Sequence, residues 1–182
     1  MHLDRRVDLM TRALPSFLDN ATWGCTIIKM NIWRPEQHIQ VKALGLVWRD
    51  GLLLATEIYR DDGTVKGVRP LGGQVEFGEN WRDALVREFQ EELDVSVELF
   101  GAPLILENIY SHHGEVGHEI AFVSDVALPP HAYQESSMIA YYEGNGEKCV
   151  ARWYDIARLD CGEVELYPSG LKAQLQERAR SA

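Results

Sequence analysis

The sequence predicts an α+β fold in which a mixed β-sheet lies between helices. Short apolar or alternating segments, each ended by Gly, Pro or Asp turn signals, recur from residue 39 onward. Two further segments have helical patterns, one after Asn80 and one near residues 169–180. A chain of 182 residues is long enough to bury one substantial core around such a sheet.

The first 38 residues read as an extension before the main domain, which we place at 39–182. Residues 3–14 have a weak helical pattern that Pro15 ends, and Cys25–Ile32 is β-branched enough for one strand. The extension suits a dimer contact or a lid over the substrate as well as it suits a loose arm packed on the core. The sequence leaves these alternatives open.

The domain begins with strand patterns joined by recognisable turns. Residues 39–48 are apolar on both faces, which predicts a central strand, and Arg49–Gly51 predicts a hairpin turn into a returning strand at 52–59. A polar loop follows. Residues 67–71 then predict a short strand that leads into a tight turn at Gly72-Gly73.

Beyond the first helix, residues 95–100 and 104–110 predict two strands, because Gly101 and Pro103 separate them. A loop is expected at 111–117 and a strand at 118–128.

The last third of the chain predicts a long polar loop, a final strand and a closing helix. We expect the loop at 131–147 and the strand at 148–154. Pro168 opens the helix, which should turn Leu171 and Leu175 inward.

Composition narrows the function classes. The net charge of −10 argues against binding long nucleic acid, which needs a basic surface. The three cysteines are odd in number and far apart, which argues against a zinc cluster or a disulfide framework. No stretch has the length of a signal peptide's apolar run or of a membrane span, so we expect a cytoplasmic protein without a membrane partner.

The helix after Asn80 separates an apolar stripe from an acidic one. The apolar stripe consists of Leu85, Val86, Phe89 and Leu93. Glu88, Glu91 and Glu92 lie at i, i+3 and i+4, where like charges repel by a few tenths of a kcal/mol per pair. A hard divalent cation such as Mg²⁺, or Mn²⁺ in its place, offsets that repulsion. On the glutamates alone, a solvated acidic helix face is the commoner explanation.

The residues upstream strengthen the metal interpretation. Gly73 is followed after five residues by Glu79, and after seven more by the run Arg87–Val95. This closely resembles the Nudix box, Gly-x5-Glu-x7-Arg-Glu-U-x-Glu-Glu-x-Gly-U, in eight of its nine specified positions. The exception is Asp94, which stands where the box has a glycine at the helix C-terminus; Asp tolerates the left-handed conformation expected there.

The resemblance implies a Nudix fold over roughly residues 39–180 and a role for each matching residue. Glu88, Glu91 and Glu92 match the family's metal-binding carboxylates, and Gly73 matches the residue whose backbone carbonyl often joins the metal. Arg87 matches the arginine that holds the catalytic glutamate in place, with Glu79 or Glu76 as its partner.

The roles of residues outside the box are implied less directly by the resemblance. The family's general base varies: it is either Glu88 or a glutamate on a later segment, and among Glu119, Glu115 and Glu143 we favour Glu119. Two arginines flank the loop before the glycines, and both are candidates for holding a substrate phosphate: Arg60 and Arg69.

The resulting hypothesis is a Mg²⁺-dependent hydrolase that cleaves the diphosphate bond of a nucleoside diphosphate linked to another group, X. The alternative is a catalytically silent Nudix-fold module that senses a nucleotide or sugar; such modules usually lose box carboxylates, which this chain keeps. The partner in either case is a small diphosphate molecule, and a homodimer is compatible with the extension. The box does not identify X.

Overall fold

The computed structural model describes residues 35, 37–112, 114–133, 135–144, 146–162 and 164–181. In chain order the elements are β1 (Ile39–Leu46), β2 (Trp48–Arg49), β3 (Leu52–Tyr59), β4 (Val65–Gln74), α1 (Trp81–Leu93), β5 (Glu98–His112), β6 (Glu115–Ala127), β7 (Met138–Tyr142), β8 (Lys148–Tyr154), the 3₁₀ turn η1 (Ile156–Arg158), β9 (Glu165–Leu166) and α2 (Leu171–Ser181). The expected helix and strand of the N-terminal extension lie outside the described residues.

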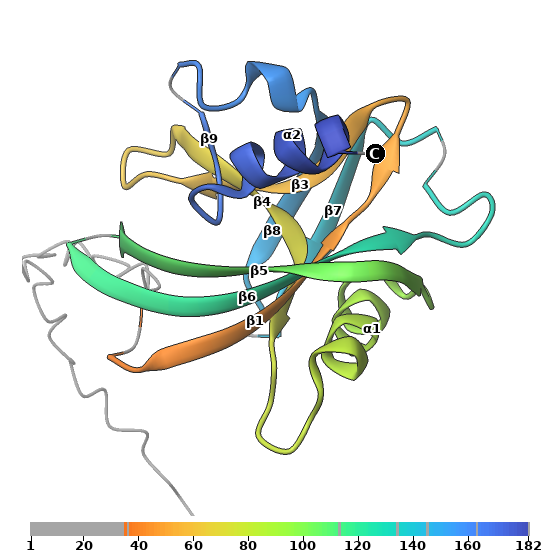
Figure 1. The fold of residues 1–182 in the computed structure, drawn as a ribbon, viewed down its shortest axis with the longest axis horizontal. Helices are drawn as coiled ribbons and strands as arrows, with labels where there is room; N and C mark the ends of the chain where they lie inside the picture. The colour runs from red at the N-terminus through yellow and green to blue at the C-terminus, as the bar shows by residue number, and fades with distance from the viewer. Residues whose placement is uncertain are drawn as a thin grey trace, which may run out of the picture. The chain divides into compact units, whose positions relative to one another are not determined.

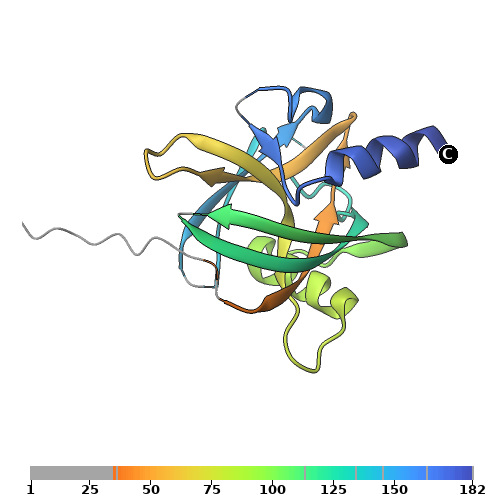
Figure 2. The same cartoon turned by 60° about the vertical axis from the view of Figure 1, so that its left-hand side comes forward.

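The strands form one mixed sheet in the order β5-β6-β1-β4-β3-β8-β7, with β2 paired to β3 and β9 paired to β4 (Figures 1 and 2). The β1–β6 and β4–β9 pairs are parallel, and the others are antiparallel. β4 joins two halves of the sheet, because its first part pairs with β3 and its last residues, from Leu71, pair with β1. The predicted central strand is confirmed: β1 lies between β6 and β4.

Each helix covers one face of the sheet. In β1, Ala43 faces the core cluster that contains Leu85 and Phe89 of α1, and Leu44 faces the second cluster, which contains Leu171 and Leu175 of α2. This alternation is the two-residue period of a strand buried on both faces. The predicted sheet between helices is therefore confirmed, as is the inward packing of the closing helix (Figure 1).

Helix α1 has the predicted boundaries. The Asn80 side chain accepts hydrogen bonds from the backbone N–H groups of Arg82 and Asp83, at 3.0 and 3.1 Å. Asp94 ends the helix with φ 53° and ψ 39°, and its N–H returns to the Gln90 carbonyl. An aspartate thus adopts the left-handed conformation at the position where the box has glycine.

The predicted turn at Gly72-Gly73 is wrong. Both residues lie in β4, paired with Leu44 and Ala43 of β1. Gly72 has φ 123°, and a Cβ on it would meet the Ala43 carbonyl oxygen. The glycines therefore permit close approach within a strand, where the dipeptide alone had indicated a reversal.

Three later predictions also need correction. Residues 95–110 do not hold two strands, since β5 runs from Glu98 to His112 with a register irregularity between Phe100 and Leu104. The expected loop at 111–117 is mostly strand, because Ser111 and His112 pair with Val116 and Glu115.

The expected loop at 131–147 contains β7, whose Ile139 and Tyr141 are buried in the α1-side core. The strand at 148–154 is confirmed as β8, although the two-residue β9 follows it. Neither helix among the described residues is long and apolar enough to cross a membrane.

Candidate functional site

The Glu88 carboxylate packs directly on Gly73. A Cβ on Gly73 would overlap both oxygens of that carboxylate, so only glycine leaves room for it. The side chain of Glu88 is only 13% exposed, and burial raises its pKa, an effect that Arg87 partly offsets. Strand β4 and helix α1 thus bring a backbone position and a carboxylate together, as the box spacing predicts.

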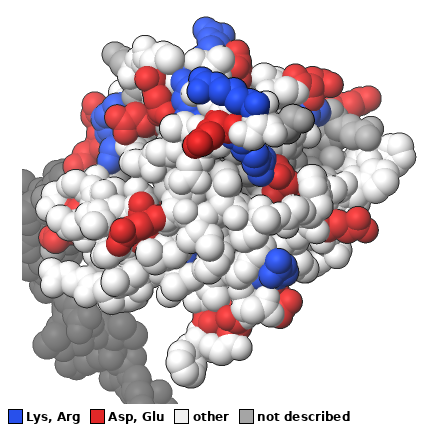
Figure 3. Space-filling model, viewed as in Figure 1, with Lys and Arg blue, Asp and Glu red and all other residues white. Residues whose placement is uncertain are grey.

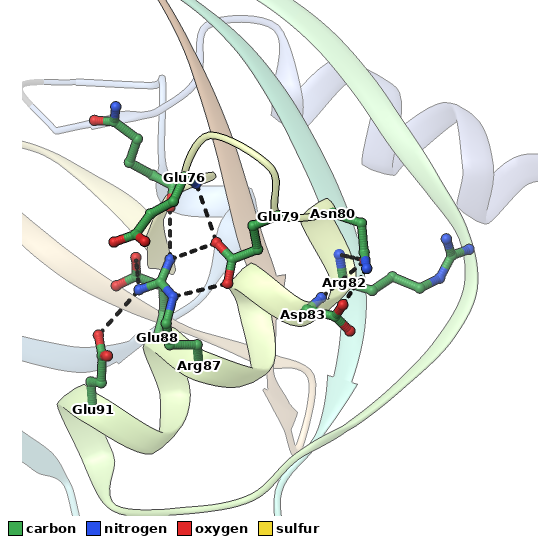
Figure 4. A network of polar contacts seen from close by, with 9 residues as sticks. Glu76, Glu79, Asn80, Arg82, Asp83, Arg87, Glu88 and Glu91 are labelled. Carbon is green, nitrogen blue, oxygen red and sulfur yellow. Dashed lines mark hydrogen bonds and ion pairs between the residues drawn. The ribbon is translucent and has the colours of Figure 1, made fainter.

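Arg87 holds the acidic residues around it in place (Figure 4). Its guanidinium donates to both carboxylate oxygens of Glu79, each at 3.0 Å, and to the Gln74 carbonyl at 2.9 Å. It also donates to Glu88 at 3.0 Å and to Glu91 at 3.1 Å. The hydrogen bonds to Glu79 raise the pKa of Arg87 and lower that of Glu79. Of the two partners that the sequence allowed for Arg87, the structure shows Glu79.

Glu92 presents a buried carboxylate without a hydrogen-bond partner. Both of its oxygens are buried, and neither receives a hydrogen bond. Burial and the nearby charge of Glu143 raise the pKa of Glu92 to about 8. A buried carboxylate that lacks donors is costly unless a cation or a proton meets it.

Two basic residues lie close to these carboxylates. Arg69 of β4 is 3.8 Å from Glu143 and donates to the Gly72 carbonyl at 3.4 Å. Lys42 of β1 is half-buried, and burial together with the charge of Arg69 lowers its pKa, against the charges of Glu119, Glu143 and Glu88. The site therefore combines carboxylates that suit a cation with cations that suit a phosphate.

Among the described residues, the buried side-chain polar atoms without a partner are Gln40 Oε1, Arg69 Nε, Glu92 Oε1 and Glu92 Oε2. These atoms come from three elements that meet at this site: β1, β4 and α1. Gln40 is the register partner of Glu119 and lies two residues from Lys42 on the same face of β1. Polar atoms left unpaired in a protein interior usually need an explanation, and a bound ligand is one.

The sequence-predicted residues divide into two groups. Glu88, Glu91, Glu92, Arg87 and Gly73 come together around the second half of α1 and the end of β4, and the Arg69 and Glu119 charges act on the same surroundings.

Arg60 lies elsewhere. Its guanidinium donates to the Thr64 hydroxyl and the Val65 carbonyl, at the beginning of β4. Gly73 lies near the other end of β4, roughly 25 Å further along the strand. The structure therefore does not bring Arg60 to the box.

The three candidate bases differ in placement. Glu115 is exposed at the β5–β6 hairpin, remote in register from Gln40 and Lys42. Glu119 is buried in β6 and accepts a 2.8 Å hydrogen bond from the side-chain amide of Asn108, whose Oδ1 accepts from the Ser169 N–H at 3.2 Å. Glu143, in the loop after β7, lies beside Arg69 and contributes most among the charges that raise the pKa of Glu92.

Sequence reasoning missed Lys42 and Gln40. The signal was present, since both are polar in a strand that is otherwise apolar on its two faces. Their position at the site depends on the pairing of β1 with β6 and β4, which the sequence pattern does not give.

The carboxylate oxygens of the box suit a hard cation, although the glutamate side chains do not point toward a single common position. No three His, Cys, Asp or Glu side chains among the described residues form a ready metal cluster. Glu88 and Glu91 are instead both bonded to Arg87, which satisfies part of their charge. The unpaired oxygens of Glu92 and the space that Gly73 leaves beside Glu88 are the features that suit Mg²⁺ or Mn²⁺.

Comparison with known proteins identifies the family. The family model of the NUDIX domain matches residues 38–168, and the chain therefore belongs to the Nudix hydrolase family. The Nudix fold predicted from the sequence is confirmed with it. No curated protein matches the sequence.

Solved structures with a similar fold include a MutT NUDIX hydrolase from Burkholderia pseudomallei, 18% identical with a TM-score of 0.49, covering 76% of this chain and 98% of that one. A MutT protein from Methanosarcina mazei Go1 is 16% identical with a TM-score of 0.49, covering 81% and 98%. An ADP-ribose pyrophosphatase from Streptococcus suis 89-1591 is 15% identical with a TM-score of 0.46, covering 79% and 92%. Similarities this distant do not indicate a substrate.

Proposed function

We propose that the protein is a Mg²⁺-dependent hydrolase that cleaves the diphosphate bond of a nucleoside diphosphate linked to another group. The observation that carries the proposal is the Glu92 carboxylate, buried and without a partner, one helical turn from Glu88, which itself packs on Gly73. A structural acidic helix face would keep its carboxylates in solvent or in ion pairs. A carboxylate buried without a donor is explained by a cation that joins it when the ligand is bound.

Glu88, Glu91 and Glu92 would hold the cation, together with the Gly73 carbonyl. Bound there, Mg²⁺ supplies charge for the diphosphate oxygens and lowers the pKa of a bound water. Arg87 keeps Glu79 and Glu88 in fixed positions through its hydrogen bonds, so it acts on the metal ligands and does not need to touch the substrate.

Arg69 and Lys42 would bind the non-bridging oxygens of the diphosphate. Both carry positive charge close to Glu143 and Glu119, and Arg69 has a buried Nε–H without an acceptor. A phosphate oxygen is an acceptor that this N–H can donate to. This arrangement replaces the phosphate role that the sequence gave to Arg60.

The general base would be a carboxylate outside the box. Glu119 remains our first candidate, because Asn108 fixes its orientation while its second oxygen keeps free lone pairs. Glu143 is the competing candidate, since its charge acts directly on Glu92. Turnover of Glu119→Gln and Glu143→Gln as a function of pH separates them, because only loss of the base removes the acidic limb of the profile.

The experiment is a turnover screen over nucleoside triphosphates, ADP-ribose, nucleotide sugars and dinucleoside polyphosphates with Mg²⁺ or Mn²⁺. The matched pair of variants is Glu91→Gln, in the box, and Glu98→Gln, an exposed glutamate of β5. We expect turnover of at least one substrate class, a fall of about 100-fold or more in Glu91→Gln and no change in Glu98→Gln.

Two results would count against the proposal. Undiminished turnover in Glu91→Gln, with the fold intact, would remove the box from the chemistry. Saturable binding of a nucleotide or sugar without turnover, in either metal, would instead identify a sensing module.

A further inference from the structure

A row of three buried polar residues crosses the sheet at the site. Gln40 of β1, Glu119 of β6 and Asn108 of β5 are register partners, and they are 7%, 6% and 3% exposed. Neighbouring strands lie about 4.8 Å apart, so the three side chains leave the sheet next to one another on the same face. Figure 3 shows few charged side chains across the outward surface of β5 and β6, in agreement with a polar row that points inward.

Two members of this row hold each other, whereas the third has no partner. The Asn108 amide donates to Glu119 Oε1 at 2.8 Å, and its own Oδ1 accepts from the Ser169 N–H at 3.2 Å. These hydrogen bonds fix the orientation of the amide and of the carboxylate. In the described part of the chain no donor reaches the buried Gln40 Oε1, and none reaches the second oxygen of Glu119. Two neighbouring strands therefore each present an acceptor oxygen without a protein donor.

Lys42 connects this row with the proposed diphosphate site. It lies two residues from Gln40 on the same side of β1, and the charges of Arg69, Glu119 and Glu88 all act on it. In the proposed function, Lys42 and Arg69 bind the diphosphate oxygens. A phosphate oxygen is itself an acceptor, so it cannot satisfy Gln40 Oε1. The Gln40 oxygen needs a molecule at this site that brings an O–H or N–H group.

The water that attacks phosphorus has the donors that this pair of acceptors lacks. It carries two O–H groups, and it must turn a lone pair toward phosphorus to react. One acceptor oxygen for each O–H fixes both hydrogens and thereby directs the lone pair, whereas a base alone would leave one O–H free to rotate. Amide side chains orient the attacking water in other phosphoryl-transfer sites.

We propose that Gln40 is a further catalytic residue, which orients the attacking water for Glu119. This role rests on the proposed hydrolysis, with Glu119 as its general base. As the water oxygen bonds to phosphorus, one of its protons passes to the free oxygen of Glu119, and the other O–H donates to Gln40 Oε1. The bridging P–O bond breaks, and its electron pair leaves with the bridging oxygen. Gln40 thus directs the nucleophile and is unchanged by the reaction.

The experiment compares Gln40→Met, which removes the acceptor and keeps the length of the side chain, with Gln176→Met, the same change at an exposed position of α2. Steady-state kinetics use the best substrate of the turnover screen. In Gln40→Met we expect kcat to fall by about 10- to 100-fold and KM to stay within about 2-fold, because Gln40 contacts the water and not the substrate. Gln176→Met should match the wild type in both constants.

Two further measurements separate this role from a structural one. Thermal unfolding without substrate should give Gln40→Met a Tm equal to or above that of the wild type, because a buried acceptor without a donor costs stability. A double-mutant cycle with Glu119→Gln should be non-additive in kcat, because orienting the water has less effect once its base is lost.

The outcomes distinguish failure of this role from failure of the proposed function. Unchanged kinetics in Gln40→Met, a raised KM with unchanged kcat, a lowered Tm, or losses that add to those of Glu119→Gln would overturn the role of Gln40 and leave the hydrolase in place. A wild type that turns over no substrate class of the screen would overturn the proposed function and the role of Gln40 together.

Discussion

Glu92 gives the sharpest test of the site, because its effect on stability has a predicted direction and does not require a known substrate. Its carboxylate is buried and unpaired, and its pKa is raised from 4.5 to about 8. A carboxyl whose pKa is higher in the folded than in the unfolded protein stabilises the fold below pH 4.5. That stability is lost as the pH rises toward 8, because the unfolded chain releases the proton first.

The size of the effect follows from the shift. One pKa unit corresponds to 1.36 kcal/mol, so the metal-free protein should lose up to about 4 kcal/mol through Glu92 between pH 4.5 and 8. Glu92→Gln keeps the shape of the side chain and cannot ionise. For a domain of this size 1 kcal/mol moves Tm by roughly 2–4 °C, so the variant should gain up to about 8–16 °C over the wild type at pH 8 and almost none at pH 5.

The measurement is Tm in EDTA for the wild type, for Glu92→Gln and for Glu98→Gln, the exposed control on β5. Mg²⁺ added at pH 8 should raise the wild-type Tm and should raise that of Glu92→Gln much less, because the cation favours the ionised carboxylate. If Glu92→Gln differs from the wild type equally at both pH values, Glu92 does not carry a desolvated charge and the reasoning from burial fails.

Three further predictions concern the frame around the cation. Gly73→Ala should lower turnover by about 100-fold, because the new Cβ occupies the position of the Glu88 carboxylate. Gly162→Ala, whose Cβ meets open space, should turn over substrate as the wild type does. Steady-state kinetics of both variants on any substrate from the screen tests this prediction. Arg87→Lys should destabilise the fold by about 1–2 kcal/mol and weaken Mg²⁺ binding, because a lysine cannot donate two parallel hydrogen bonds to the Glu79 carboxylate. Denaturant unfolding with and without Mg²⁺ measures the stability and the Mg²⁺ binding, with Arg180→Lys as the control. Asn108→Leu should lower turnover through Glu119, and a double-mutant cycle with Glu119→Gln should show the two changes to be non-additive; additive losses would mean that Asn108 acts elsewhere.

The sequence allowed helix α1 and the placement of its acidic side chains to be predicted because they depend on local signals. The division between Phe89 and the glutamates follows from the helical period. The cap at Asn80 and the left-handed Asp94 follow from the residue types at the two ends of the helix. The contact of Arg87 with Glu79 was predictable for another reason, since the box resemblance names both positions.

The glycine pair and the late strands were not predictable in the same way. Gly72-Gly73 has the composition of a turn, and only the packing of Ala43 and Glu88 against it shows why glycine is needed inside a strand. In β7 the alternation of buried Ile139 and Tyr141 with exposed neighbours is a strand signal. The polar residues on either side of that short segment concealed it.

The two faces of β1, β6 and β5 show why the site could be predicted only in part. On one side of these strands lie Gln40, Lys42 and Glu119, and on the other lie apolar residues such as Ile39 and Val41 of β1. Because side chains alternate with a period of two, a shift of one residue in the β1–β6 register would put Glu119 on the side of Ile39 and Val41 while Lys42 stayed on the other side. The pairing that brings Lys42 and Glu119 to one side therefore also keeps these charges away from the side of Ile39 and Val41. A sequence can show that polar and apolar residues alternate, but the register between β1 and β6, which are distant in the chain, decides which residues of the two strands share a face.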